Sequence, residues 1–195
     1  PGDDAASSVK RCIACSFESP LSEADWLEHQ QDEAREDALA SALAEIRDGH
    51  PQAAVKRLAG IVNAAQADLA GRAIRAIGSA RCEEAVCALD EIAGGDDEQL
   101  RAAALRHLGS LRMESAAQAL LRHHDRLPEV RPLVERALIA GGDAAVDLLA
   151  ARLARRGSED SGPWEQLLVR IATERAKQAL VRWRVGLCLA RVSQR

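Results

Sequence analysis

The sequence is poor in aromatic residues, with no tyrosine, one phenylalanine and three tryptophans among 195 residues. Strands of β-sandwiches and barrels draw on aromatic and β-branched side chains, so this shortage argues against an all-β fold. The chain has no apolar run of about 18 residues, and no membrane-spanning helix is predicted. Five cysteines are too few for a dense disulfide framework, which favours the reducing cytoplasm, or the periplasm if an export signal has been removed.

Alanine is abundant instead, with 39 residues of the 195. Alanine and leucine, which supply most of the apolar residues, are the strongest helix formers, so the chain is predicted to be almost wholly helical. The hydrophobic fraction of 47% and the charged fraction of 29% are those of a folded globular protein. The length fits a single domain of ordinary size.

The sequence repeats itself at a spacing of 31 residues. Residues 73–79 (AIRAIGS) align without a gap with residues 104–110 (ALRHLGS), and the apolar residues that follow each stretch align as well. Positions 47, 78, 109, 140 and 172 are equivalent in five such units, so the last step is 32 residues and the others are 31. A fixed period of this length is typical of stacked repeats.

Each unit is predicted to form two helices, because apolar residues recur at three- and four-residue spacing on either side of a short break. Breaks between units contain glycine or proline, at residues 94–97, at Pro128 and at residues 157–163. One helix pair cannot bury its own apolar stripe, so neighbouring pairs must stack. The sequence therefore predicts an all-α fold, a right-handed α-solenoid of about five helical hairpins with a period of about 31 residues.

These units resemble a known family of repeats. With Ile77-Gly78 and Leu108-Gly109 near the end of the first helix, the pattern is similar to bacterial HEAT-like repeats of the phycobilisome-lyase type, over about residues 34–186. Such repeats often begin with an acidic residue followed by a Val-Arg pair, and only parts of this motif are present in the sequence. The resemblance implies the architecture and leaves the activity open, because the family includes chromophore lyases, scaffolds and adaptors.

The ends of such a stack need caps, since the outer repeats would otherwise expose apolar faces. We expect residues 1–20 to form a flexible N-terminal tail and residues 21–195 to form a single HEAT-like domain. Within that domain, residues 21–47 are predicted to form an N-terminal cap helix and residues 183–195 a C-terminal cap.

Two cysteines, Cys12 and Cys15, form the one short motif with chemistry of its own. Thiolates at this spacing can share a zinc ion or exchange a disulfide, but a structural zinc site needs two further ligands and no second pair is apparent. They are weak metal candidates, and no cofactor is predicted. The other cysteines, Cys82, Cys87 and Cys188, fall at or near predicted core positions, where cysteine behaves as a small hydrophobe.

Motifs for catalysis are missing. The chain has no Gly-x-Ser-x-Gly nucleophile elbow and no phosphate-binding Gly-x4-Gly-Lys-Ser/Thr loop. HEAT-like metal hydroxylases carry paired His-Glu motifs, and this sequence contains no His-Glu dipeptide. The His123-His124 pair falls at a predicted helix end, where the helix dipole favours a cation. No catalytic residue is therefore predicted, and we do not expect an enzyme.

Charge is distributed unevenly along the chain. Residues 1–97 carry 9 basic and 19 acidic side chains, whereas residues 98–195 carry 17 basic and 11 acidic ones. If the second helix of each unit lines the concave face, several arginines fall on its polar side, where guanidinium groups suit carboxylate or phosphate ligands. The predicted partner-binding residues are Arg57, Gln118, Arg122, Arg152, Arg175 and Arg182. The other interpretation is that these are ordinary solvated charges.

We therefore expect a scaffold, adaptor or assembly factor that binds an acidic or phosphate-bearing segment or helix of another protein. The alternatives are a nucleic-acid-binding protein similar to HEAT-like DNA glycosylases and a chromophore-lyase-like protein. A protein partner is favoured over nucleic acid because the net charge is −4 and Trp183 is predicted to be buried, which leaves few aromatic side chains for bases. The acidic front and basic back also predict weak head-to-tail self-association.

Overall fold

The computed structural model describes residues 23–64, 66–156 and 161–193, and in these ranges the chain is helical with no strand. This confirms the all-α prediction. The helices are α1 (Glu23–Arg47), α2 (Pro51–Ala64), α3 (Ala67–Ser79), α4 (Glu83–Ala93), α5 (Glu98–Leu111), α6 (Glu114–Arg126), α7 (Arg131–Gly141), α8 (Asp143–Arg156), α9 (Gly162–Ile171) and α10 (Glu174–Ser193), with a short 3-10 helix η1 (Pro128–Val130) before α7.

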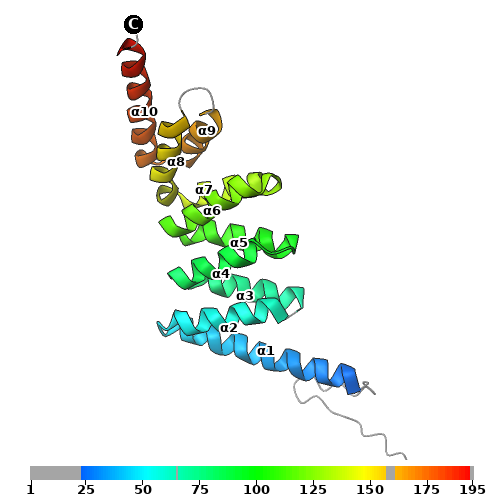
Figure 1. Cartoon of the computed structure of the whole chain (residues 1–195). Helices are drawn as coiled ribbons and strands as arrows, with labels where there is room; N and C mark the ends of the chain where they lie inside the picture. Colours follow the sequence, from blue (N-terminus) through cyan, green and yellow to red (C-terminus); the bar gives the residue numbers. More distant parts are fainter. Residues whose placement is uncertain (1–22, 65, 157–160, 194–195) are drawn as a thin grey trace, which may run out of the picture.

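Each helix packs mainly against helices that are near in the sequence. Odd-numbered helices contact the next odd-numbered helix, from α1·α3 to α7·α9, and even-numbered helices contact the next even-numbered helix, from α2·α4 to α8·α10. Consecutive helices also contact one another along the whole chain. The result is an elongated molecule in which α1 lies at one end and α10 at the other (Figure 1).

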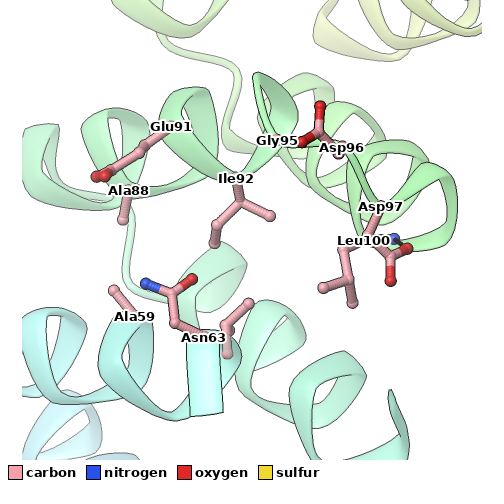
Figure 2. A pocket seen from close by; sticks show the side chains of 10 residues that line it. Ala59, Asn63, Ala88, Glu91, Ile92, Gly95, Asp96, Asp97 and Leu100 are labelled. Atoms are coloured by element: carbon pink, nitrogen blue, oxygen red, sulfur yellow. Dashed lines mark hydrogen bonds between the residues drawn. The ribbon is translucent and has the colours of Figure 1, made fainter. Parts of the chain in front are cut away.

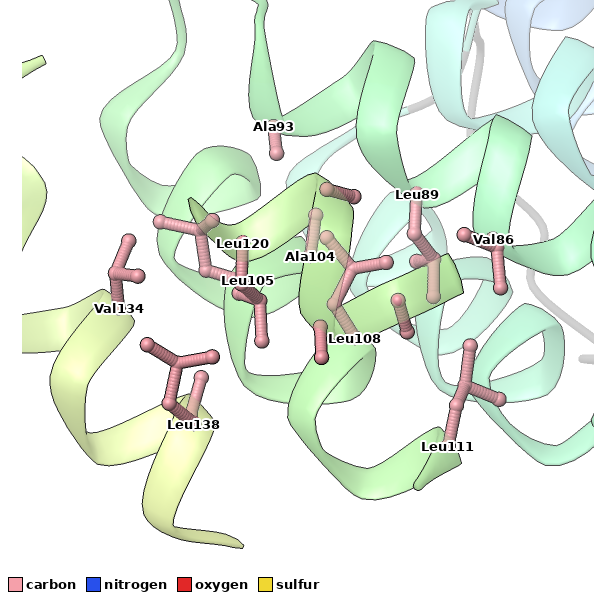
Figure 3. Packing of buried hydrophobic residues seen from close by; sticks show 14 of the residues in the cluster. Val86, Leu89, Ala93, Ala104, Leu105, Leu108, Leu111, Leu120, Val134 and Leu138 are labelled. Carbon is pink, nitrogen blue, oxygen red and sulfur yellow. The ribbon is translucent and has the colours of Figure 1, made fainter. Parts of the chain in front are cut away.

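A continuous hydrophobic core runs through the described residues, from Leu39 in α1 to Leu180 in α10. Figure 3 shows its middle part, where Leu105 and Leu108 of α5 lie between Leu89 of α4 and Leu138 of α7. Each of these leucines is almost fully buried, which contributes about 2 kcal/mol to folding relative to an exposed leucine. The repeated i, i+3 and i+4 spacing of apolar residues in the sequence supplies this core.

Helix ends fall at the predicted breaks. Residues 94–97 separate α4 from α5, and the Asp97 side chain accepts hydrogen bonds from the backbone N–H groups of Gln99 (2.8 Å) and Leu100 (3.0 Å), which caps α5. Pro128 lies in the 3-10 helix between α6 and α7, and a left-handed Gly142 (φ 60°) separates α7 from α8.

Two glycines allow the odd-numbered helices to approach closely. A Cβ atom at Gly109 in α5 would lie 2.4 Å from the carbonyl oxygen of Ala137 in α7, and one at Gly78 in α3 would lie 2.6 Å from Nδ1 of His107 in α5. These positions are 31 residues apart in the sequence. Any larger residue at Gly109 would push α5 and α7 apart, because its neighbour there is backbone.

Several sequence predictions about individual positions need revision. Cys87 and Cys188 are exposed, so the prediction that they lie at core positions is wrong for these two, whereas Cys82 is half-buried. Trp183 was predicted to be buried and is half-buried. Trp164 is buried, with 3% of its surface exposed. The division into tail, domain and caps stays a prediction, and residues 1–20 with Cys12 and Cys15 lie outside the described residues. None of the described helices is long and apolar enough to cross a membrane.

Candidate functional site

The six predicted binding residues all lie on even-numbered helices. Arg57 is in α2, Gln118 and Arg122 are in α6, Arg152 is in α8, and Arg175 and Arg182 are in α10. Successive even-numbered helices contact one another, so the helices that carry these residues form one layer of the molecule. We call the outer side of α2, α4, α6, α8 and α10 the even-helix surface.

The junction between α4 and α6 is bridged through one carboxylate. Arg122 donates from Nη2 to Oδ2 of Asp90 (2.7 Å), and Nε2 of His123 lies 2.8 Å from Oδ1 of the same aspartate. His123 is buried and Arg122 is half-exposed, so Asp90 joins a buried group to a surface group. Asp90 therefore ties two successive even-numbered helices together.

The junction between α6 and α8 has a second bridge, which continues to α9. Arg152 donates from both terminal nitrogens to Asp125, at 2.7 and 2.6 Å, and its guanidinium carbon lies 5.0 Å from the ring centre of Trp164. These hydrogen bonds lower the pKa of Asp125. A bidentate pair with a stacked aromatic ring holds the Arg152 side chain in a fixed position.

His124 is also buried beside Trp164, next to the bridge between α6 and α8. Its ring centre is 4.7 Å from that of Trp164, and its Nδ1 atom is buried without a hydrogen bond to the described residues. Burial lowers the pKa of His124, and the positive charge of Arg131 lowers it further. His123 and His124 lie in the last turn of α6, as the sequence predicted, and both are buried in the packing between helices.

The other four predicted binding residues differ in the contacts that they make. Arg175 of α10 pairs with Asp147 of α8, and Arg57 of α2 pairs with Glu45 of α1. Gln118 is exposed and bonds only weakly to Glu114 (3.4 Å) on its own helix. Arg182 is exposed and has no ion-pair partner among the described residues.

Most of the predicted arginines are thus already neutralised. Arg122, Arg152 and Arg175 each bind an aspartate on the preceding even-numbered helix, and we call these three pairs the Asp–Arg ladder. Sequence reasoning found the arginines and missed Asp90, Asp125 and Asp147. The signal was present, since each aspartate lies 27 to 32 residues before its arginine, which is close to the repeat spacing.

The junction between α2 and α4 is different, because it contains a pocket of about 400 Å³. Ala59 and Val62 of α2, Ala88 and Ile92 of α4 and Leu100 of α5 form its apolar part. Figure 2 shows Ile92 pointing toward Asn63 across the gap between the two helices.

Three carboxylates line the same pocket. Glu91 lies on α4, and Asp96 and Asp97 follow it in the turn before α5. Asp97 is occupied in capping α5, while Glu91 and Asp96 are exposed and make no ion pair with the described residues. Among the described residues that line the pocket there is no lysine, arginine or histidine, and Arg101 beside it donates to the backbone carbonyl of Gly95 at 3.2 and 2.7 Å. We call this site the acidic pocket.

The two junctions differ in the residues that stand 31 positions apart in the sequence. Position 59 lies 31 residues before Asp90, and position 91 lies 31 residues before Arg122. Asp90 of α4 therefore corresponds to Ala59 of α2, and Arg122 of α6 corresponds to Glu91 of α4. The bridge is missing because one partner is an alanine and the other has the opposite charge, which leaves space and an excess of negative charge.

The far end of the molecule carries an exposed apolar surface. Val181 is 61% exposed, Val185 52% and Leu189 64%, and they follow one another at every fourth position of α10. We call these three residues the α10 stripe. Among the described side chains of α10 the last buried one is Leu180, and in Figure 1 the C-terminal part of this helix extends beyond α8 and α9. Exposed apolar residues at helical spacing are typical of an interaction surface.

The structure offers little support for metal or thiol chemistry in the residues that it describes. No group of three or more histidine, cysteine, aspartate or glutamate side chains there is arranged to hold a metal ion. Burial raises the pKa of the Cys82 thiol, so this cysteine is less reactive than a free one.

Comparison of the chain with protein-family models, with curated proteins and with solved structures finds no match.

Proposed function

We propose that this protein is a non-catalytic protein-interaction module, built as an α-solenoid of HEAT-like helical pairs with a period of about 31 residues. The regular neighbour contacts, α1·α3 to α7·α9 and α2·α4 to α8·α10, support the repeat architecture. The register that relates Ala59 and Glu91 to Asp90 and Arg122 supports the period. Stacked helical pairs offer long surfaces in place of deep reactive pockets, and such surfaces suit macromolecular partners.

The observation that carries this proposal is the even-helix surface. It extends from α2 to α10. Five of the six predicted binding residues on it, all except Arg152, are exposed to solvent. The sixth, Arg152, is held against Trp164. A surface of this length can contact several turns of a partner helix or an extended segment.

The Asp–Arg ladder changes the kind of partner that we expect. An acidic segment would have to compete with Asp90, Asp125 and Asp147 for their arginines. Arg182 has no such competitor among the described residues. We therefore propose a partner protein of mixed charge, with its acidic part near Arg182 and its basic part near the acidic pocket.

Nucleic-acid binding has less support. A phosphate backbone requires a broadly positive surface with unpaired lysines or arginines. Here Arg122, Arg152 and Arg175 are paired within the chain, and Trp164 is buried where it cannot stack on a base.

Site-directed photo-crosslinking tests the proposed surface. A photoreactive amino acid placed at Gln118 samples the even-helix surface, and the same residue at Arg136, which is exposed on the odd-numbered helix α7, is the matched control. In lysate of the cells that make the protein, we expect the Gln118 variant to crosslink to one specific protein, identified by mass spectrometry, and the Arg136 variant not to. Equal crosslinking from both sites, or crosslinks to nucleic acid alone, would contradict the proposal.

A further inference from the structure

We propose that the acidic pocket binds the α10 helix of a second copy of this chain, so that copies associate head to tail. This inference rests on the proposed function and deepens it, because it identifies the basic partner segment at the acidic pocket as the α10 helix of a second copy. It rests on three observations: the ion pair that the α2–α4 junction lacks, the exposed face of α10 that carries Val181, Arg182 and Val185, and the opposite charges of the two surfaces.

The acidic pocket lacks the group that the next junction has. At the α4–α6 junction the half-exposed guanidinium of Arg122 pairs with Asp90 across the two helices. At the α2–α4 junction Glu91 and Asp96 line the pocket together with apolar residues that include Val62 and Ile92. Arg101 lies beside it, but its guanidinium donates to the backbone carbonyl of Gly95 and not to these carboxylates. A ligand that completes this junction would carry a guanidinium or ammonium group next to aliphatic side chains.

The α10 helix has this composition. It contains five basic side chains and one acidic one, and Arg182 on its exposed face has no ion-pair partner among the described residues. Two residues of the α10 stripe are close to Arg182: Val181 precedes it in the sequence, and Val185 follows it by about one helical turn. The helix can therefore place Arg182 against Glu91 and Asp96 while the valines cover the apolar floor, as an amphipathic helix does in a groove.

The two surfaces cannot meet within one molecule. Helix α10 packs against α8 and α9, whereas the acidic pocket lies between α2 and α4 toward the opposite end. Contact between them requires a second copy, and a contact between two different surfaces leaves one free pocket and one free helix at the ends of every assembly. Copies would therefore add one after another unless the rotation between them closes a ring.

Sedimentation velocity of the full chain tests this inference. For the unmodified protein in about 50 mM salt we expect the average mass to rise at least twofold above the monomer with increasing concentration, and to fall again in about 500 mM salt, because the contact is partly ionic. A mass that stays at the monomer value at every concentration and at both salt concentrations would overturn the proposal.

Two variants block one surface each. Glu91→Arg with Asp96→Arg blocks the acidic pocket, and Arg182→Glu with Val185→Asp blocks α10; all four side chains are exposed, and circular dichroism checks that helicity is kept. Each variant alone should associate at least about tenfold more weakly than the unmodified protein. The control variant, Asp48→Arg with Glu129→Arg, makes the same charge change at exposed sites outside the pocket and should associate normally.

Mixing the two variants gives the decisive result. Each retains the surface that the other has lost, so the equimolar mixture should form a dimer and stop there. A pocket variant that still associates by itself would show that α10 pairs with α10 or with another surface, and this overturns the inference. Failure here leaves the crosslinking result at Gln118 unchanged, so the two proposals are tested separately.

Discussion

Two neighbouring junctions on the same side of the molecule are built differently. Between α4 and α6, Asp90 binds Arg122 and the buried His123, while between α2 and α4 the equivalent positions hold Ala59 and Glu91 beside an acidic pocket. The hydrophobic core continues through both. The described residues of α2 and α4 thus pack together without an ion pair between the two helices, and this leaves Glu91 and Asp96 exposed at the surface.

The largest effect is expected from Asp90→Ala. This change leaves Nε2 of the buried His123 without its partner and removes the ion pair to Arg122, which should lower the free energy of unfolding by about 2 kcal/mol. Glu91→Ala, at the adjacent residue, is the matched control and should cost less than about 0.5 kcal/mol because Glu91 is exposed and makes no ion pair with the described residues. Urea unfolding measures both, and similar losses in the two variants would contradict the comparison.

A smaller effect is expected where the α6–α8 bridge is removed. Arg152→Ala loses the bidentate hydrogen bonds to Asp125 and the contact with Trp164, and should cost about 1 kcal/mol in urea unfolding. Arg155→Ala, three residues later on the exposed side of α8, should be nearly neutral. If Arg152 is a solvated charge like Arg155, the two variants will unfold at the same urea concentration.

The smallest change in the free energy of unfolding is expected when the ion pair that the α2–α4 junction lacks is introduced. Ala59→Asp combined with Glu91→Arg copies the Asp90–Arg122 pair one repeat earlier. In a double-mutant cycle we expect the two changes to stabilise one another by about 0.5 kcal/mol, and this coupling should weaken in high salt. A coupling of zero would mean that positions 59 and 91 are not spaced like positions 90 and 122.

The helices themselves were largely predictable from the sequence. Residues 94–97 and Pro128 interrupt helices where the sequence places breaks, because glycine and proline act through their own backbone geometry. The apolar spacing likewise identified Ile77 and Leu108 as buried. Such properties depend on residues a few positions apart, so a single sequence contains them.

The candidate site was only partly predictable. Sequence reasoning placed the arginines on one surface but treated Arg122 and Arg152 as available for a ligand, because their aspartates are on other helices. The burial of His123 and His124 was missed for the same reason, since it depends on α4 and α9. The acidic pocket was missed because it results from what positions 59 and 91 lack, and only a register-by-register comparison of the junctions makes that visible.

The order of helix contacts described above also affects how the chain folds and comes apart. The main contacts join helices that are at most two positions apart in the chain, so forming each one closes only a short loop and costs little chain entropy. Folding can begin at any helix pair and spread in both directions. Under tension or heat the terminal pairs can detach one at a time while the middle of the molecule stays intact, and a duplicated pair would lengthen the protein without altering the packing elsewhere.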